Sequence, residues 1–342
     1  FLTLFIVSAK CAVFLKNRDN DSAAKPCGNS HAKGRFKSRQ NTFLSDTKKK
    51  EQWLIATSFI LAAVTGFFYF AQHPVMTVDP DRESAAQTRA IKEHDLSHDD
   101  IIGNWLNFRG PYGNGIAYNA TPAVHWDGRT GEGIIWKTKI ALPCKSSPIV
   151  HENRIFITGA TKDKKAVMSY DLTTGRQLWV VDVHDHVKGG KKNETDLVDT
   201  GYAASTMACD GKRLFAVFTT GEIICLSVKG DIIWYGSHDL SDNMYGHASS
   251  LMVFGNKLYV QLDKKTDAKL LVLNAMTGDT IKAIARDGMT SWASPVIYHP
   301  KGKEPQLIVN ANPYTISYNL ATDTENWRTK CLTGDVAPSI AY

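Results

Sequence analysis

A short unit that recurs from about residue 147 onward constrains the fold of this chain more than any other feature. Its first full copy, residues 169–179, is an apolar strand, an Asp-x-x-Thr-Gly turn and a short strand that carries Trp179. In such a turn the Asp side chain bonds its own backbone two residues on, and the Gly supplies a positive φ without steric cost. Related copies occupy residues 226–234, 273–279 and 318–327. The chain is therefore built from repeats.

The spacing of the repeats indicates the architecture. Each copy follows a strand start made of small residues, at Ser147, Ser205, Ser249 and Ser294, and a fifth start stands at Pro338. Successive starts are 58, 44, 45 and 44 residues apart. A period near 44 with four short strands per unit is typical of a β-propeller blade. We therefore predict an all-β propeller of four-stranded blades, with blades over 145–183, 204–237, 247–286 and 292–330.

The repeated Asp-x-x-Thr-Gly-x-x-x-Trp unit resembles the blade signature of the pyrroloquinoline-quinone (PQQ)-like β-propeller family. That family includes quinoprotein alcohol dehydrogenases and non-enzymatic propellers such as the lipoprotein of the outer-membrane β-barrel assembly machinery. The resemblance covers residues 104–342, and stretches 108–115 and 246–250 resemble exported bacterial members. It implies a closed ring of seven or eight blades, so we expect the four blades and one further strand start to be a fragment. Members that bind quinone and members that do not share the signature, so it implies a fold rather than a chemistry.

Two features bear on how the blades pack. Residues 126–140, with Trp136, match the closing strand of a blade, which in a ring would complete the last blade and hide its edge. Trp179, Trp234 and Trp327 recur after the turn, whereas Lys282 stands at that place in blade three. Because the Trp comes once per repeat, we favour packing between blades over a quinone-binding floor.

A transmembrane segment precedes the repeats. Residues 53–71 contain no charge over 19 residues, about 28 Å as a helix, with Trp53 and Tyr69 near the ends. We predict an uncleaved signal-anchor over 53–72, because this core is too long for a typical signal peptide and no small-x-small cleavage site follows it. Lys48 to Lys50 precede the span, so the positive-inside rule puts the N-terminus in the cytoplasm. With the bacterial resemblance, this predicts an inner-membrane protein whose propeller faces the periplasm.

Charge and polarity divide the rest of the chain. Residues 1–52 hold eleven Lys/Arg against four Asp/Glu without apolar periodicity, which predicts a disordered cytoplasmic tail. Residues 73–103 are a polar linker, and 104–342 are the propeller domain. Residues 101–342 are nearly neutral, with 26 Lys/Arg against 23 Asp/Glu, and this excludes an electrostatic footprint for nucleic acid.

The six cysteines suggest no metal or haem motif. No Cys-x-x-Cys or Cys-x-x-Cys-His occurs, which disfavours zinc ribbons and attached c-type haem. Cys209 and Cys225 are expected on neighbouring strands and could pair in an exported protein, but we favour small buried thiols. Many quinoprotein alcohol dehydrogenases carry a disulfide between two adjacent cysteines. This sequence has no adjacent Cys-Cys pair, which counts modestly against that assignment.

Four residues are candidates for a ligand site. Tyr202, His247 and Trp292 stand at or just before inner-strand starts, so they are expected to converge near one mouth of the channel. The alternative is that they are satisfied structural residues. Arg109 lies in the Gly-rich loop 108–115, where its planar fork could bind a carboxylate. We favour the other interpretation, in which Arg109 bonds carbonyls and pins the N-terminal segment across the propeller.

A metal site and a catalytic set are weaker candidates. His184 and His186, with Asp199 and His247, could suggest zinc, but residues 184–203 resemble an exposed loop, so we expect solvated histidines and no metal. The quinoprotein family uses an Asp base beside Ca²⁺ held by Glu and Asn. We cannot match an Asp and a Glu to that pattern, and assign no catalytic residue.

Three functions remain open. The leading one is a membrane-anchored extracytoplasmic propeller acting as a binding or scaffolding module, with the bilayer at 53–72 and an envelope protein or a small channel ligand as partner. The alternative is a PQQ-dependent quinoprotein oxidoreductase of the alcohol or polyol dehydrogenase type, with PQQ and Ca²⁺ in the channel. The third is a propeller domain of a larger enzyme.

Overall fold

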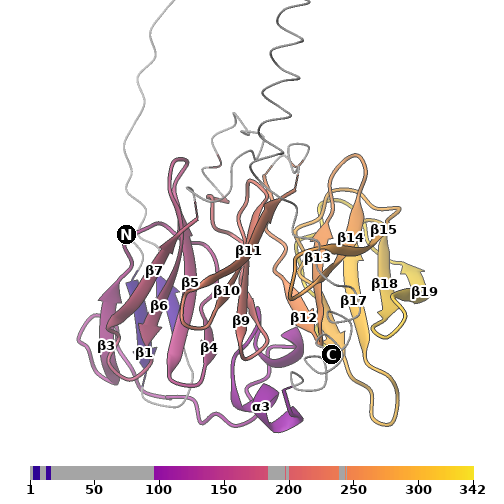
Figure 1. Ribbon diagram of the computed structural model, residues 1–342. Helices are drawn as coiled ribbons and strands as arrows, with labels where there is room; N and C mark the ends of the chain where they lie inside the picture. The colour runs from indigo at the N-terminus through magenta and orange to yellow at the C-terminus, as the bar shows by residue number, and fades with distance from the viewer. Residues whose placement is uncertain are drawn as a thin grey trace, which may run out of the picture. The chain divides into compact units, whose positions relative to one another are not determined.

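Four antiparallel sheets of four strands follow one another along the chain (Figure 1). In each sheet the strands lie in sequence order, so every blade is a meander. Blade one is β4 (Ile149–His151), β5 (Arg154–Ala160), β6 (Lys165–Asp171) and β7 (Gln177–Asp182); blade two is β8 (Ala208–Cys209), β9 (Arg213–Val217), β10 (Glu222–Ser227) and β11 (Ile232–Ser237). Blade three is β12 (Met252–Phe254), β13 (Lys257–Leu262), β14 (Lys269–Asn274) and β15 (Thr280–Ala285); blade four is β16 (Val296–Tyr298), β17 (Gln306–Ala311), β18 (Tyr314–Asn319) and β19 (Thr324–Lys330). These sheets confirm the predicted all-β fold of four-stranded repeats.

The computed structural model describes residues 3–7, 13–16, 96–183, 197, 200–238, 243 and 245–342. The predicted signal-anchor at 53–72 lies outside these residues, as do His184, His186, Asp199 and the linker up to residue 95. Within the described ranges, no helix is both long and apolar enough to cross a membrane. The described residues all belong to one compact unit, formed by Phe1–Asp19 and Ala90–Tyr342.

Shorter elements precede blade one. β3 (Ile134–Lys139) lies in the stretch predicted as a closing strand and pairs with β1 (Thr3–Val7), which pairs with β2 (Val13–Lys16). β1 and β2 fall within the tail for which composition predicts disorder. The helix α3 (His98–Gly103) begins at a capping box, in which Ser97 Oγ accepts from Asp100 N at 3.1 Å and the Asp100 carboxylate accepts from Ser97 N at 3.2 Å. A 3-10 turn, η1 (Pro111–Gly113), follows it.

The core lies between successive blades. All five residues of β9 are buried, because one face of blade two packs on blade one and the other on blade three. Phe156 and Phe218 share the core between blades one and two, and Phe215 and Leu258 share the next. Strands with two covered faces are continuously apolar, which explains why the inner strands show no polar alternation.

A Trp on each of the strands β3, β7 and β11 packs on the Gly of the turn in the blade that follows. The indoles lie so close to the turns that a Cβ on the Gly would overlap them. A Cβ on Gly175 would lie 2.4 Å from the Trp136 ring, one on Gly230 would lie 3.0 Å from Trp179, and one on Gly278 would lie 2.7 Å from Trp234. Two indoles also donate from Nε1, Trp136 to Leu172 O at 2.9 Å and Trp234 to Ala275 O at 3.0 Å. Packing between blades, predicted from the recurrence of Trp, is confirmed for Trp179 and Trp234.

At the junction between blades three and four, both the Trp and the turn Gly are replaced by other residues. Lys282 stands in the Trp position, and Asp323 stands in the Gly position with φ 52°. Lys282 Nζ donates to Asp323 O at 2.7 Å, while the Asp323 carboxylate accepts from Lys257 Nζ at 2.7 Å and from Tyr259 OH at 2.9 Å. A polar contact thus substitutes for the indole. On β19, Trp327 is 42% exposed.

A ladder of hydroxyl groups links the starts of the inner strands. The backbone N–H of one blade donates to the hydroxyl of the next: Ser147 to Thr206 (2.9 Å), Thr206 to Ser250 (3.1 Å), Ser250 to Ser294 (2.9 Å) and Ser294 to Ser339 (3.0 Å). We call this series the hydroxyl ladder. It explains why each repeat begins with small residues, since a larger side chain would separate the strands.

Residues 105–113, which we call the strap, contact all four blades in turn. Trp105 exchanges two backbone hydrogen bonds with Val150 on β4, and Leu106 O accepts from Cys209 N on β8 at 2.9 Å. Gly113 lies against blades three and four, where a Cβ would meet Met252 at 3.2 Å and Val296 at 3.3 Å. The N-terminal segment is therefore pinned across the blades.

Candidate functional site at the start of the inner strands

Trp292, just before β16, anchors a cluster that contains three of the four predicted residues. Its Nε1 donates to Asn243 Oδ1 and to Gly246 O, both at 3.1 Å. The ring of Tyr245 lies 5.2 Å from the indole at an angle of 55°, and Tyr245 is 42% exposed. The residues before β12 thus hold the indole in place and cover it with a second aromatic ring.

Backbone hydrogen bonds connect His247 and Tyr202 to the same place. His247 N donates to Thr219 O at 3.1 Å, and Thr219 N donates to Tyr202 O at 3.2 Å. Gly246 is required here, because its φ is 72° and a Cβ would lie 2.2 Å from the Thr219 methyl group. Tyr202 is thus linked to His247 through Thr219, and Trp292 bonds Gly246, the residue before His247. We call this group, with Asn243, Tyr245 and Gly246, the Trp292 cluster; its role in ligand binding stays a prediction.

Arg109 is engaged elsewhere. Its Nη1 donates to Ile340 O at 3.0 Å, and its guanidinium lies against Gly115. This carbonyl contact is the one expected if Arg109 pins the N-terminal segment. The strap lies along the other ends of the inner strands, where it bonds Val150 and Cys209.

His247 is a neutral group at the base of the cluster. Its side chain is 2% exposed, burial lowers its pKa to about 4, and its Nε2 has no hydrogen-bond partner among the described residues. A neutral imidazole can donate or accept one hydrogen bond but contributes no charge near pH 7. Its chemistry suits recognition of a polar group rather than acid catalysis.

Beneath the cluster lies a buried ion pair. Asn243 Nδ2 donates to Asp263 O at 3.4 Å, and the Asp263 carboxylate lies 2.9 Å from Arg286 Nε. Gln261 Nε2 also donates to Asp263 and to Asn310 O at 2.8 Å. Burial raises the pKa of Asp263, against the opposing effect of Arg286. Asp263 Oδ2 accepts from Gln261 Nε2 and from Arg286 Nη2, and the side chain is fully buried, so Asp263 supports the blade.

Three other carboxylates are also paired with a basic side chain. Glu222 pairs with Lys165 at 3.3 Å, Asp210 with Arg213 at 2.7 Å, and Asp323 with Lys257 at 2.7 Å. In the part of the chain that the structure describes, no group of three or more His, Cys, Asp or Glu side chains could hold a metal ion. Ca²⁺ needs six to eight oxygen ligands, which these paired carboxylates do not offer. The described residues therefore do not fit the Ca²⁺ that would accompany PQQ.

The described cysteines are all free thiols. Cys144, Cys209 and Cys225 are buried and Cys331 is exposed. Burial raises the pKa of Cys144 to about 12, and also raises those of Cys209 and Cys225. The favoured interpretation of Cys209 and Cys225 as small buried side chains is confirmed, and they form no disulfide.

The family model of the outer membrane protein assembly factor BamB matches residues 110–238. This match covers blades one and two, whose turns carry the repeated signature. This match and the fold support a likeness to the PQQ-like β-propeller family. A search of curated proteins returned no match.

Two solved structures resemble this chain in fold. The quinohemoprotein alcohol dehydrogenase ADHIIG from Pseudomonas putida HK5 matches at 15% identity and a TM-score of 0.53, over 69% of this chain and 42% of that one. BamB from Moraxella catarrhalis matches at 15% identity and a TM-score of 0.40, over 58% of this chain and 55% of that one. The chain thus spans about half the length of these proteins, and the likeness is one of fold alone.

Sequence reasoning missed part of the Trp292 cluster. Asn243 and Tyr245 were not singled out, although they precede Gly246 and His247, which were. The sequence signal that could have pointed to them is their place directly before Gly246 and His247. The contact of Asn243 with Trp292 joins residues 49 positions apart, so no local pattern could reveal it.

Proposed function

We propose that this chain is a membrane-anchored, extracytoplasmic propeller that acts as a binding or scaffolding module through the Trp292 cluster. The observation that carries the proposal is the pair of Tyr245 and Trp292 rings, with the indole held by Asn243 and Gly246. Exposed aromatic rings held on a rigid support are typical of binding surfaces. Asp263, the buried carboxylate residue bonded to Asn243 of the cluster, is paired with Arg286, which favours recognition over proton or metal chemistry.

The proposed setting is the bacterial inner membrane, spanned once by residues 53–72, with the propeller in the periplasm. The description of the matching family model, an outer membrane protein assembly factor, supports an envelope protein as partner. The near-neutral charge of the propeller domain disfavours nucleic acid.

Site-specific photo-crosslinking in intact cells tests the binding role. A photoreactive residue in place of Tyr245 should give a defined adduct with an envelope protein, and Trp292→Ala should abolish that adduct. A photoreactive residue in place of Ile281, which is 51% exposed on β15, is the matched control and should give none. An adduct that survives Trp292→Ala, or no adduct at position 245, would overturn the proposal.

Reconstitution distinguishes this role from the dehydrogenase alternative. We expect the purified full chain, supplied with PQQ and Ca²⁺, to leave an artificial electron acceptor unreduced in the presence of an alcohol or a polyol. Reduction that depends on both PQQ and Ca²⁺ would establish a quinoprotein oxidoreductase instead.

A further inference from the structure

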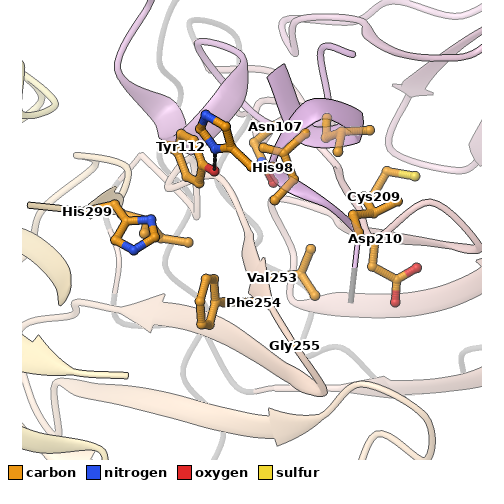
Figure 2. A pocket seen from close by; sticks show the side chains of 13 residues that line it. His98, Asn107, Tyr112, Cys209, Asp210, Val253, Phe254, Gly255 and His299 are labelled. Atoms are coloured by element: carbon orange, nitrogen blue, oxygen red, sulfur yellow. Dashed lines mark hydrogen bonds between the residues drawn. The ribbon is translucent and has the colours of Figure 1, made fainter. Parts of the chain in front are cut away.

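We propose that a cavity under the strap, at the ends of the inner strands away from the Trp292 cluster, binds a small neutral aromatic molecule. The cavity has a volume of about 270 Å³ and is lined by α3, the strap and the first hairpins of blades two to four (Figure 2). The binding role proposed above does not involve these residues.

Chain order separates the cavity from the Trp292 cluster. Asp210 and Phe254 lie where β8 and β12 end, and His299 directly follows β16. Tyr202 and Trp292, in contrast, precede β8 and β16. The two places therefore lie at opposite ends of the same inner strands.

The lining is suited to an apolar body. Ile101, Leu106, Val253, Phe254 and Ile297 contribute aliphatic and aromatic surface from α3, the strap, blade three and blade four. The volume corresponds to about nine water molecules and lies just below the usual range for ligand pockets. It suits a single substituted ring rather than a larger cofactor.

Aromatic and imidazole rings gather on one side of the cavity (Figure 2). The Tyr112 ring lies 6.1 Å from that of His98 at 21°, and 6.2 Å from that of His299 at 69°. His98 Nδ1 and Tyr112 OH are 2.9 Å apart and share a hydrogen bond. These rings offer both stacking and edge contacts, which favours an aromatic ligand over an aliphatic one.

The polar groups of the cavity favour a neutral ligand. The Asp210 carboxylate is satisfied, because it accepts from Arg213 Nε at 2.7 Å and from two backbone N–H groups. Asn107 Oδ1 is buried and has no hydrogen-bond partner among the residues described. The site thus has no unpaired charge and has polar groups for one hydroxyl or amide.

Backbone geometry holds Tyr112 over the cavity. Arg109 and Tyr112 have φ of 61° and 58°, a region that residues other than Gly rarely adopt. Strain of this kind persists where surrounding structure enforces it, and it concentrates at ligand sites. Here Gly113, wedged against Met252 and Val296, fixes the turn that carries the ring.

Ligand-observed saturation-transfer NMR on the full chain tests the site, with phenol as the probe and cyclohexanol as its aliphatic counterpart. We expect phenol to bind with a Kd on the order of 1 mM, as suits a ligand of this size, and cyclohexanol to bind several-fold more weakly. Phe254→Ala and His299→Ala should each weaken phenol binding by about five-fold or more. His299 is exposed, so its replacement leaves the fold intact.

Two control variants separate this site from others. His125→Ala removes an exposed histidine that does not line the cavity and should leave phenol binding unchanged. Trp292→Ala should also retain it, which keeps this proposal independent of the Trp292 cluster. Failure to bind phenol, equal binding by His299→Ala, or loss of binding in Trp292→Ala would each overturn the assignment.

Discussion

Gly278 allows two blades to pack closely, because it has no side chain where the Trp234 indole lies. Its φ is 79°, and a Cβ would lie 2.7 Å from the Trp234 ring. The residue must therefore adopt a left-handed conformation and also leave room for an indole. Only Gly meets both conditions without strain.

Gly278→Ala should lower the free energy of unfolding by about 2 kcal/mol or more, because the methyl group meets both the unfavourable φ and Trp234. Gly131→Ala is the matched control. Gly131 has φ 87° with nothing within 4 Å of its Cβ position, so it should cost only about 1 kcal/mol. Denaturant unfolding measures both variants, and equal losses would show that the contact with Trp234 contributes nothing.

His247 makes stability depend on pH. Its pKa is about 4 in the folded chain against 6.5 in the unfolded one, so the unfolded chain takes up the proton first. Stability from this residue is complete above pH 6.5 and should fall by about 3 kcal/mol as the pH drops to 4.

Urea unfolding between pH 4 and 7 should therefore show a shallower pH dependence for His247→Gln than for the wild type. The exposed His125→Gln should keep the wild-type slope. A wild-type slope in His247→Gln would contradict the assigned pKa.

At the scale of elements, the hydroxyl ladder joins blades through one hydrogen bond per inner strand. Ser250 is one rung, since its Oγ accepts from Thr206 N at 3.1 Å. Its neighbour Ser249 is equally buried, but its Oγ has no partner among the described residues. The two adjacent serines thus differ in whether the side-chain hydroxyl has a hydrogen-bond partner.

Ser250→Ala should lower the free energy of unfolding by about 1 to 3 kcal/mol, because it leaves the buried Thr206 N–H unpaired. Ser249→Ala should be neutral or slightly stabilising, since it removes an unsatisfied hydroxyl. Thermal melts of the two variants make the comparison, and a larger loss for Ser249→Ala would refute the role of the ladder.

How far the sequence could predict these elements depends on whether the information was local. The strand Lys257–Leu262 and the Trp–turn packing follow from short patterns that recur in each repeat. The replacement of Trp by Lys282 was visible, but its partner Asp323 was not recognised as standing in a Gly position. The ladder was missed although each of its residues stands at or directly after a predicted strand start, because each hydrogen bond joins residues at least 44 positions apart.

The candidate sites divide in the same way. Tyr202, His247 and Trp292 could be grouped because each stands two or three residues before a small-residue strand start, at Ser205, Ser249 and Ser294. The cavity under the strap could not be predicted, because it depends on Tyr112 crossing to blades three and four.

For the whole molecule, the distribution of charge predicts topology. A reporter that is active only outside the cytoplasm, fused after Ser97, should be active, because Lys48 to Lys50 retain the N-terminus inside. Changing those three lysines to Glu should lower the activity. An inactive wild-type fusion would refute the exported location.

The hydroxyl ladder also bears on how such a chain can change in length. Every rung needs only a backbone N–H from one blade and a hydroxyl from the next, whatever the rest of either blade contains. A duplicated stretch of about 44 residues would bring its own acceptor for the blade before it and its own donor for the blade after it. We infer that duplication or loss of a whole repeat leaves every remaining junction intact, whereas insertion of part of a repeat breaks one.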